Sequence, residues 1–121
     1  MNCPKCQAAM ETVSYEGIEV QRCTSCKGLW FAALEAEHLK NMKGSESIDT
    51  GDPAKGRSMN TINKILCPEC ATPMIQMVDM DHPDLHFESC KVCYGLFFDA
   101  GEFRHYKEPH ILAFFKKLLG K

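Results

Sequence analysis

The chain lacks the two features that send a protein into or across a membrane. None of its apolar runs approaches the roughly 20 residues that a membrane-spanning helix needs. Its first residues, Met1-Asn2-Cys3-Pro4, show neither the basic region nor the apolar stretch of a secretory signal peptide. We therefore expect a soluble, cytoplasmic protein with no membrane span.

A strong excess of charge is also missing. The sequence has 14 Lys and Arg residues against 16 Asp and Glu residues, which gives a formal net charge of −2. A protein that binds nucleic-acid phosphates without sequence preference needs a basic face. The balance argues mildly against nucleic acid as a partner, although a local patch of Arg22, Lys27, Lys40 and Lys43 would still permit it.

Signatures of catalysis are absent as well. The chain has no Ser–His–Asp order and no glycine-rich loop of the kind that cradles phosphates. A redox-active CxxC pair is typical of a βαβ setting with one low-pKa thiol at a helix N-terminus, and no such setting is apparent. We therefore expect that the protein is not an enzyme.

Cysteine, in contrast, is abundant and regularly spaced. The eight cysteines form four CxxC pairs in two repeated sets, which are Cys3, Cys6, Cys23 and Cys26, then Cys67, Cys70, Cys90 and Cys93. Each CxxC pair places two sulfurs on one tight turn, and two such turns complete a tetrahedron around a metal ion. The pattern predicts two Cys₄ sites, with disulfides, redox thiols and iron as the alternatives.

A Cys₄ site has two consequences for function. Four thiolates leave no coordination position for water or substrate, so the site is structural and not hydrolytic. Around Zn²⁺ the four thiolates also carry a net charge of −2, so two filled sites would move the chain from −2 to about −6. Units of about forty residues bury too little apolar surface to fold unaided, which makes a metal staple expected.

The repeat sets the expected organisation of the chain. We expect a first unit over residues 1–43, a flexible linker over 44–61, a second unit over 62–107 and an amphipathic C-terminal helix over 108–121. The linker prediction follows from a polar stretch with three glycines and a proline. The apolar residues of the C-terminal segment suit a lid over the second unit, a partner contact or a membrane-surface helix.

Within each unit the pattern predicts a β-hairpin and then a short helix. In the first unit, apolar residues alternate on both sides of Glu16-Gly17, which is typical of a two-residue hairpin turn. Spaced apolar residues then predict a helix over residues 34–43. In the second unit, Asp99 is placed to cap a helix, with Glu102 reaching back from the third position. The fold class is a small metal-stabilised α+β protein.

Aromatic side chains follow the second CxxC pair of each unit. Trp30 with Phe31, and Phe97 with Phe98, are the first candidates for the core of their units. Adjacent residues of an extended segment point to opposite faces, so one of each pair is a candidate for an outward-facing, partner-binding ring. Two further candidates for partner binding, Phe114 and Phe115, lie in the C-terminal segment.

A Glu-x-x-His pair also recurs, as Glu35 with His38 and as Glu102 with His105. One helical turn apart, each pair is spaced to line a second ion or to tune a cysteine thiolate. The plainer interpretation is a capping glutamate followed by a half-buried histidine. His82, His86 and the aspartates between them are candidates for weak binding of a divalent ion, although the plainer interpretation is a solvated loop.

The knuckle sequences CPxC, followed by CxxCxGLWF or CxxCxGLFFDAGE, resemble the transcription-factor-IIB-type zinc-finger family. The resemblance covers residues 3 to about 40 and 67 to about 107. It implies two tandem zinc ribbons, and it favours Zn²⁺ over iron, with one ion for each quartet. The first copy departs from the family pattern at Ala32, Ala33 and Leu34, where Asp-Ala-Gly is expected. The family name reports likeness to a ribbon of a transcription factor and does not establish a role in transcription.

Two functions remain. The first is a structural-zinc binding module that contacts a protein partner, or associates with itself, through the aromatic residues and the apolar C-terminal segment. The second is a nucleic-acid-binding, transcription-related regulator, which the family name suggests.

Overall fold

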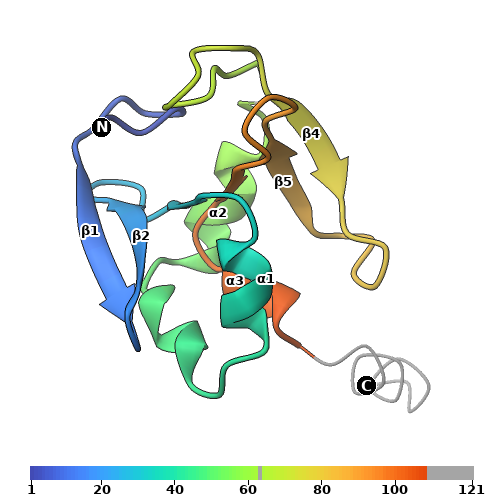
Figure 1. Cartoon of the computed structure of the whole chain (residues 1–121). Helices are drawn as coiled ribbons and strands as arrows, with labels where there is room; N and C mark the ends of the chain where they lie inside the picture. Colours follow the sequence, from blue (N-terminus) through green and yellow to red (C-terminus); the bar gives the residue numbers. More distant parts are fainter. Residues whose placement is uncertain (63, 109–121) are drawn as a thin grey trace.

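The computed structural model describes residues 1–62 and 64–108, and its elements repeat in the same order in both halves (Figure 1). The first half contains β1 (Met10–Tyr15), β2 (Ile18–Cys23), β3 (Leu29–Phe31) and α1 (Glu35–Lys40). The second contains β4 (Ile75–Val78), β5 (His86–Ser89), β6 (Leu96–Phe98) and α3 (Glu102–Tyr106). Between them lie the 3₁₀-helix η1 (Ser45–Ile48) and the helix α2 (Pro53–Met59). The small α+β fold is therefore confirmed.

The hairpin predicted around Glu16-Gly17 is present. β1 and β2 pair antiparallel with Val13 opposite Val20 and Tyr15 opposite Ile18. Glu16 and Gly17 both have positive φ, at 48° and 87°, as a two-residue hairpin turn of the primed type requires. The turn brings the hairpin ends together, and each end of the hairpin leads into a CxxC pair.

The two halves share one sheet. Its strand order is β1-β2-β3-β6-β5-β4, so the halves meet where β3 pairs with β6. Trp30 lies opposite Phe97 in this antiparallel pair, and the two residues occupy the same position of the repeat, after Cys-x-x-Cys-x-Gly-Leu. The halves are therefore related by an approximate twofold axis that passes between these two residues.

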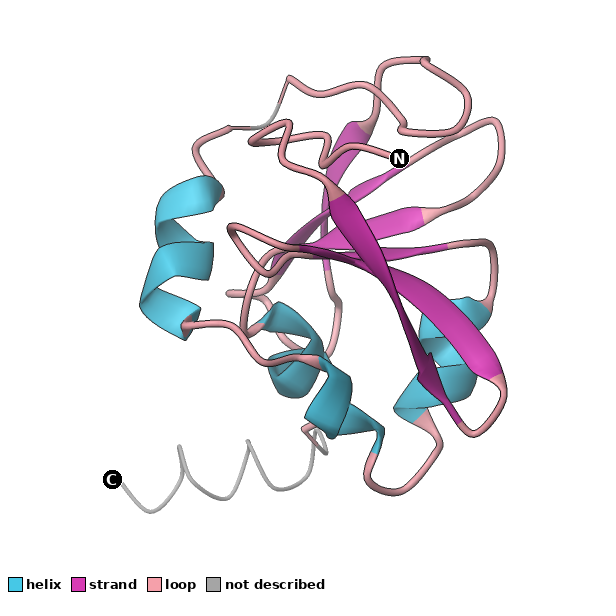
Figure 2. Cartoon of the chain, turned by 90° about the vertical axis from the view of Figure 1, so that its left-hand side faces the viewer, coloured by secondary structure: helices cyan, strands magenta, loops and turns pink. Residues whose placement is uncertain are grey.

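Both faces of the central strands are covered, which buries all four aromatic residues of the repeat. Trp30 and Phe97 pack on one face with cysteines of both quartets and Met59. Phe31 and Phe98 pack on the other face with residues of α1, η1 and α3. Figure 2 shows helices on both sides of the strands.

None of the four aromatic residues is more than 2% exposed. This corrects the expectation that one ring of each pair faces outward and receives a partner. A separate core for each unit would leave one ring of each pair outside, whereas the shared sheet has a core on each face. Phe114 and Phe115 lie outside the described residues.

Residues 44–61 also differ from the expected flexible linker. Asp52 caps α2 by accepting a hydrogen bond from the Ala54 N–H at 3.0 Å, and Pro53 occupies the first turn, where proline is tolerated. Ile48 and Met59 are buried. A Cβ on Gly56 would lie 1.9 Å from the Ala100 carbonyl oxygen, so this glycine permits close packing of α2 on the second half. Although its composition is polar, this segment packs between the two halves.

The two halves also pack closely against each other at two equivalent glycines. A Cβ on Gly28 would lie 2.4 Å from Cζ of Phe97, and a Cβ on Gly95 would lie 2.3 Å from Cη2 of Trp30. The absence of a side chain at each glycine therefore leaves room for an aromatic ring from the other half. Gly28 is not among the glycines with positive φ, so this close approach is the reason for a glycine at position 28.

We expect Gly28→Ala to lower the free energy of unfolding by about 1–3 kcal/mol, because the added methyl group would clash with the Phe97 ring. Denaturant unfolding of the metal-loaded chain measures the effect. The control is a double-mutant cycle with Phe97→Leu, in which the smaller side chain should relieve part of the cost. Strict additivity of the two changes would contradict this packing.

Candidate metal centres

The four CxxC turns share one backbone geometry. The residue after each second cysteine, namely Gln7, Lys27, Ala71 or Tyr94, has a φ between 58° and 67°. This left-handed residue turns the chain back sharply, and the turn aims backbone N–H groups at the first sulfur. In the Cys90 turn, for example, the Val92 and Cys93 N–H groups lie 3.4 and 3.5 Å from Sγ of Cys90. Such donors favour the thiolate form of cysteine.

The predicted quartets are brought together as predicted. In each of the two sets, all four sulfurs lie within 4.8 Å of one another, and all eight cysteines are free thiols. The Sγ atoms of Cys3 and Cys26 are 3.7 Å apart, and so are those of Cys67 and Cys93. A tetrahedron with Zn–S bonds of about 2.3 Å has edges of about 3.8 Å. The described thiols therefore fit one tetrahedral ion in each quartet.

Each quartet holds one thiol that ionises readily. A hydrogen bond from the Cys26 thiol lowers the pKa of Cys3 to about 5, and that pairing raises the pKa of Cys26. In the second quartet, the Cys93 N–H lowers the pKa of Cys90 to about 6. Burial raises the pKa of Cys70 to about 12. A bound cation would ionise the remaining thiols, since thiolates are the ligating form.

The first quartet is tied to the second half by a buried lysine. Lys5 lies between Cys3 and Cys6, and its ammonium group is 2.6 Å from Oδ2 of Asp99 and 3.2 Å from Oε1 of Glu88. It also donates to the Met59 carbonyl oxygen at 3.1 Å. All three charged side chains are fully buried. This charge cluster crosses the boundary between the halves.

Burial disfavours the ionised form of both carboxylates of the cluster. It raises the pKa of Glu88 to about 7 and that of Asp99 to about 6, although the attraction of Lys5 opposes the shift in both cases. The lysine therefore offsets part of the cost of burying the two carboxylates.

No local motif of the sequence predicts the Lys5 cluster. The sequence contains one indication of this cluster, because the charges of the two halves differ at equivalent positions. The first half has Lys5 in its first turn and Ala32 where the second half has Asp99. The second half has Glu69 at the position equivalent to Lys5. The substitutions are complementary, as contact across the two halves requires.

The role predicted for Asp99 is corrected by this cluster. Its side chain does not cap α3, which begins after Gly101 in a left-handed conformation with φ 82°. Instead Asp49, from the segment between the halves, accepts hydrogen bonds from the Gly101 N–H at 2.9 Å and the Arg104 N–H at 3.1 Å. Glu102 reaches back to the Asp99 N–H at 2.8 Å, as predicted.

The recurring Glu-x-x-His pairs contribute caps and not metal ligands. Glu35 accepts from the Ala32 N–H at 2.8 Å, which matches the bond of Glu102 in the second half. His38 is exposed, whereas His105 contacts Asp84 at 2.9 Å. Within residues 1–62 and 64–108, the two cysteine quartets are the groups that fit a metal ion.

His82 differs from the solvated loop that was expected. It is 2% exposed, and its Nδ1 lies 2.6 Å from Asp79 while its Nε2 lies 2.8 Å from the Glu108 carbonyl oxygen. The surrounding loop is therefore partly folded back on the end of α3.

A family model described as transcription factor zinc-finger matches the chain over residues 2–42 and again over 66–109. Each matched region contains one complete cysteine quartet. No curated protein and no solved structure matches the chain significantly. Among the helices of the described residues, none combines the length and the apolar character that crossing a bilayer requires.

Proposed function

Because the chain belongs to the transcription factor zinc-finger family, as two tandem zinc ribbons that each suit one Zn²⁺, we propose that it is a non-catalytic module that binds another protein. Its quartets support the absence of catalysis, since four thiolates fill the coordination sphere of a zinc ion. Zinc then acts by holding the shape of the chain. Eight free thiols also suit a reducing compartment such as the cytoplasm.

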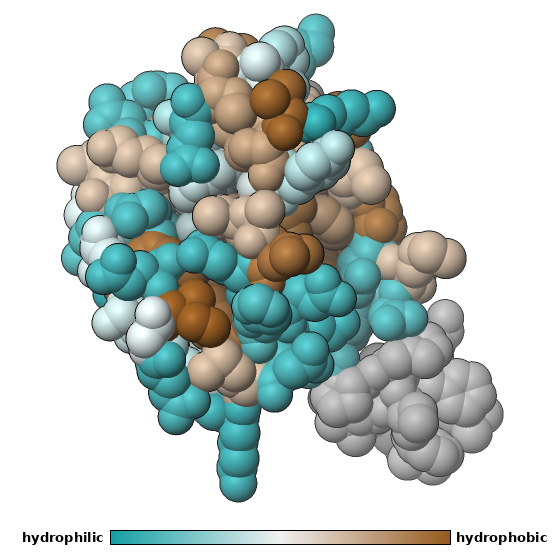
Figure 3. Space-filling model, in the orientation of Figure 1, coloured by the Kyte–Doolittle hydropathy of each residue, from teal (hydrophilic) through white to brown (hydrophobic). Residues whose placement is uncertain are grey.

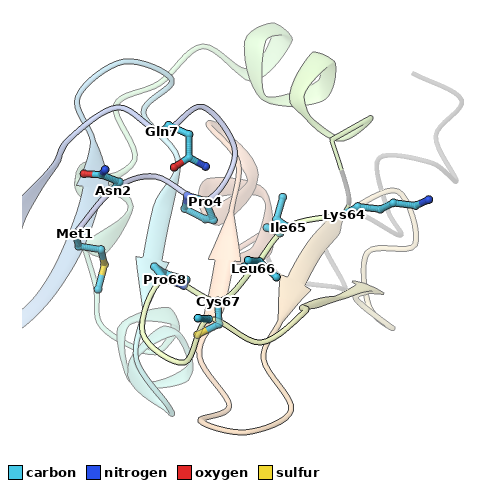
Figure 4. Close-up of a pocket in the computed structure, with 10 residues that line it drawn as sticks. Met1, Asn2, Pro4, Gln7, Lys64, Ile65, Leu66, Cys67 and Pro68 are labelled. Carbon is cyan, nitrogen blue, oxygen red and sulfur yellow. The ribbon is translucent and has the colours of Figure 1, made fainter.

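A groove between the two halves carries this proposal. It has a volume of about 600 Å³ and lies between the CPxC turns, lined by residues 1–7 of the first half and 64–71 of the second (Figure 4). Its apolar lining residues are Met1, Pro4, Ile65, Leu66, Pro68 and Ala71. Met1 and Leu66 are 48% and 55% exposed. On the face shown in Figure 3, apolar side chains lie interspersed among hydrophilic ones.

The chemistry of the groove favours protein over nucleic acid. Its described lining contains one charged side chain, Lys64. With zinc bound, each flanking quartet carries −2, so phosphates would meet a net negative field. Apolar side chains of a protein partner match the lining better, and burying them provides the driving force for association.

The test immobilises the full, zinc-loaded chain and exposes it to extract of its own cells. Wild type is compared with Leu66→Lys, which places a charge in the groove, and with Met80→Lys, which changes a 94% exposed side chain outside the groove. We expect a defined protein to bind wild type and Met80→Lys but not Leu66→Lys. Salt-dependent retention of DNA or RNA without such a protein would overturn the proposal in favour of a nucleic-acid-binding regulator.

A further inference from the structure

We propose that the groove between the CPxC turns binds an extended peptide of the partner, rich in apolar and basic residues, as an added β-strand. This inference rests on the proposed function, because it specifies how a protein partner is recognised. Its support comes from the backbone of two equivalent segments, from the groove lining and from the charge of the flanking sites.

Asn2 and Leu66 offer free backbone edges at equivalent positions of the two halves. Asn2 forms an isolated β-bridge with Ala9, and Leu66 forms the matching bridge with Pro73. In the first bridge, the Cys3 N–H donates to Ala8 at 2.8 Å and the Met10 N–H donates to Met1 at 3.1 Å. The residue between two such bonds points its own N–H and C=O groups away from its partner strand.

The second bridge repeats this arrangement. The Cys67 N–H donates to the Thr72 carbonyl at 2.8 Å, and the Met74 N–H donates to the Ile65 carbonyl at 2.9 Å. Within the described residues, no backbone hydrogen bond uses the N–H or C=O groups of Asn2 or Leu66. An unpaired strand edge of this kind is a template for pairing with another chain.

Both free edges border the same groove. Asn2 and Leu66 are among its lining residues, although their segments flank opposite ends of the strand order, next to β1 and β4. The two segments that carry the isolated bridges therefore bring their free backbone edges to one space. An extended chain entering this space has unpaired donors and acceptors on either side, and its alternate side chains meet the apolar lining.

The charge around the groove specifies the peptide further. Lys64 lines the groove, and the exposed Glu69 in the second CPxC turn offsets it. The two zinc-loaded quartets then leave a net negative charge beside the groove, because each contributes −2. Lys5, which lies between two cysteines of the first quartet, is buried against Asp99 and Glu88. Basic side chains on the peptide complement this field, and acidic ones do not.

The experiment selects short random peptides, displayed on phage, against the full zinc-loaded chain. We expect enriched sequences that combine alternating apolar residues with Lys or Arg. A synthetic peptide of the enriched sequence should bind Leu66→Lys at least about tenfold more weakly than wild type. Its affinity for Met80→Lys should equal that for wild type. Methylation of alternate backbone nitrogens on the peptide should remove binding, since the methyl groups block strand pairing.

Three outcomes would overturn the inference. These are no enriched sequence, enrichment of acidic sequences, or equal binding of the N-methylated peptide. Failure of the added-strand inference can be distinguished from failure of the proposed protein-binding function. If a cellular protein is retained in a Leu66-dependent manner but no extended peptide binds, the protein-binding role stands and the added strand is wrong. If neither is retained, the protein-binding role itself fails.

Discussion

Removing zinc from the reduced chain is expected to unfold both halves. Structural zinc in units of this size contributes an apparent binding free energy of about 10–16 kcal/mol, which is comparable with or larger than the stability of a small domain. Five cysteines of the two quartets are buried in the same core as Trp30 and Phe97, namely Cys3, Cys23, Cys26, Cys67 and Cys90. Loss of the ions therefore also removes the support of the central strands.

Circular dichroism after treatment with a strong chelator and a reductant measures this loss, with metal analysis to prove that the ions are gone. The control restores zinc to the same sample, which should recover the spectrum. An unchanged spectrum at demonstrated zero metal content would mean that the apolar core alone holds the fold.

Replacement of Lys5 by methionine is expected to lower the free energy of unfolding by about 3–5 kcal/mol. The change leaves Asp99 and Glu88 buried without their cation, and their side chains are fully inaccessible to water. The methionine keeps most of the bulk of lysine, so the loss reports charge and not a cavity. Denaturant unfolding of the zinc-loaded variant gives the value, with its zinc content checked first.

The matched control is Glu69→Met, which makes the same replacement at the equivalent position of the other half. Glu69 is exposed, so its replacement should change stability by no more than about 0.5 kcal/mol. A second variant, Lys5→Met with Asp99→Asn and Glu88→Gln, should regain part of the loss because no buried charge remains unpaired. If Lys5→Met and Glu69→Met changed the free energy of unfolding equally, the charge cluster would make no specific contribution to stability.

The features that depend on residues close in sequence were predictable. CxxC spacing identifies both quartets, because two sulfurs on one turn need only four consecutive residues. The Glu16-Gly17 hairpin follows from alternation around a turn signal. The glutamate that reaches back to the start of each helix also follows from a local motif, and both copies form this bond.

The features that join the halves were not predictable in the same way. Pairing of β3 with β6 places Trp30 opposite Phe97, and the identity of the strand that pairs with β3 is not encoded in a local pattern. For the same reason, the local pattern predicts a helix cap at Asp99, whereas the partner of Asp99 is Lys5, far away in the sequence. The composition of residues 44–61 predicts a flexible linker because its few apolar residues, among them Ile48 and Met59, make their contacts only in the folded molecule.

The approximate twofold axis between Trp30 and Phe97 explains why joining the repeats in one polypeptide matters. Two identical subunits related by such an axis would each have to carry every interfacial side chain, so a lysine and its acidic acceptors would occur in both copies. A covalent pair is free of this constraint. Here the donor is retained on one side, as Lys5, and the acceptors on the other, as Asp99 and Glu88, so a single ammonium group serves both carboxylates. Covalent linkage thus allows asymmetric chemistry within a nearly symmetric framework.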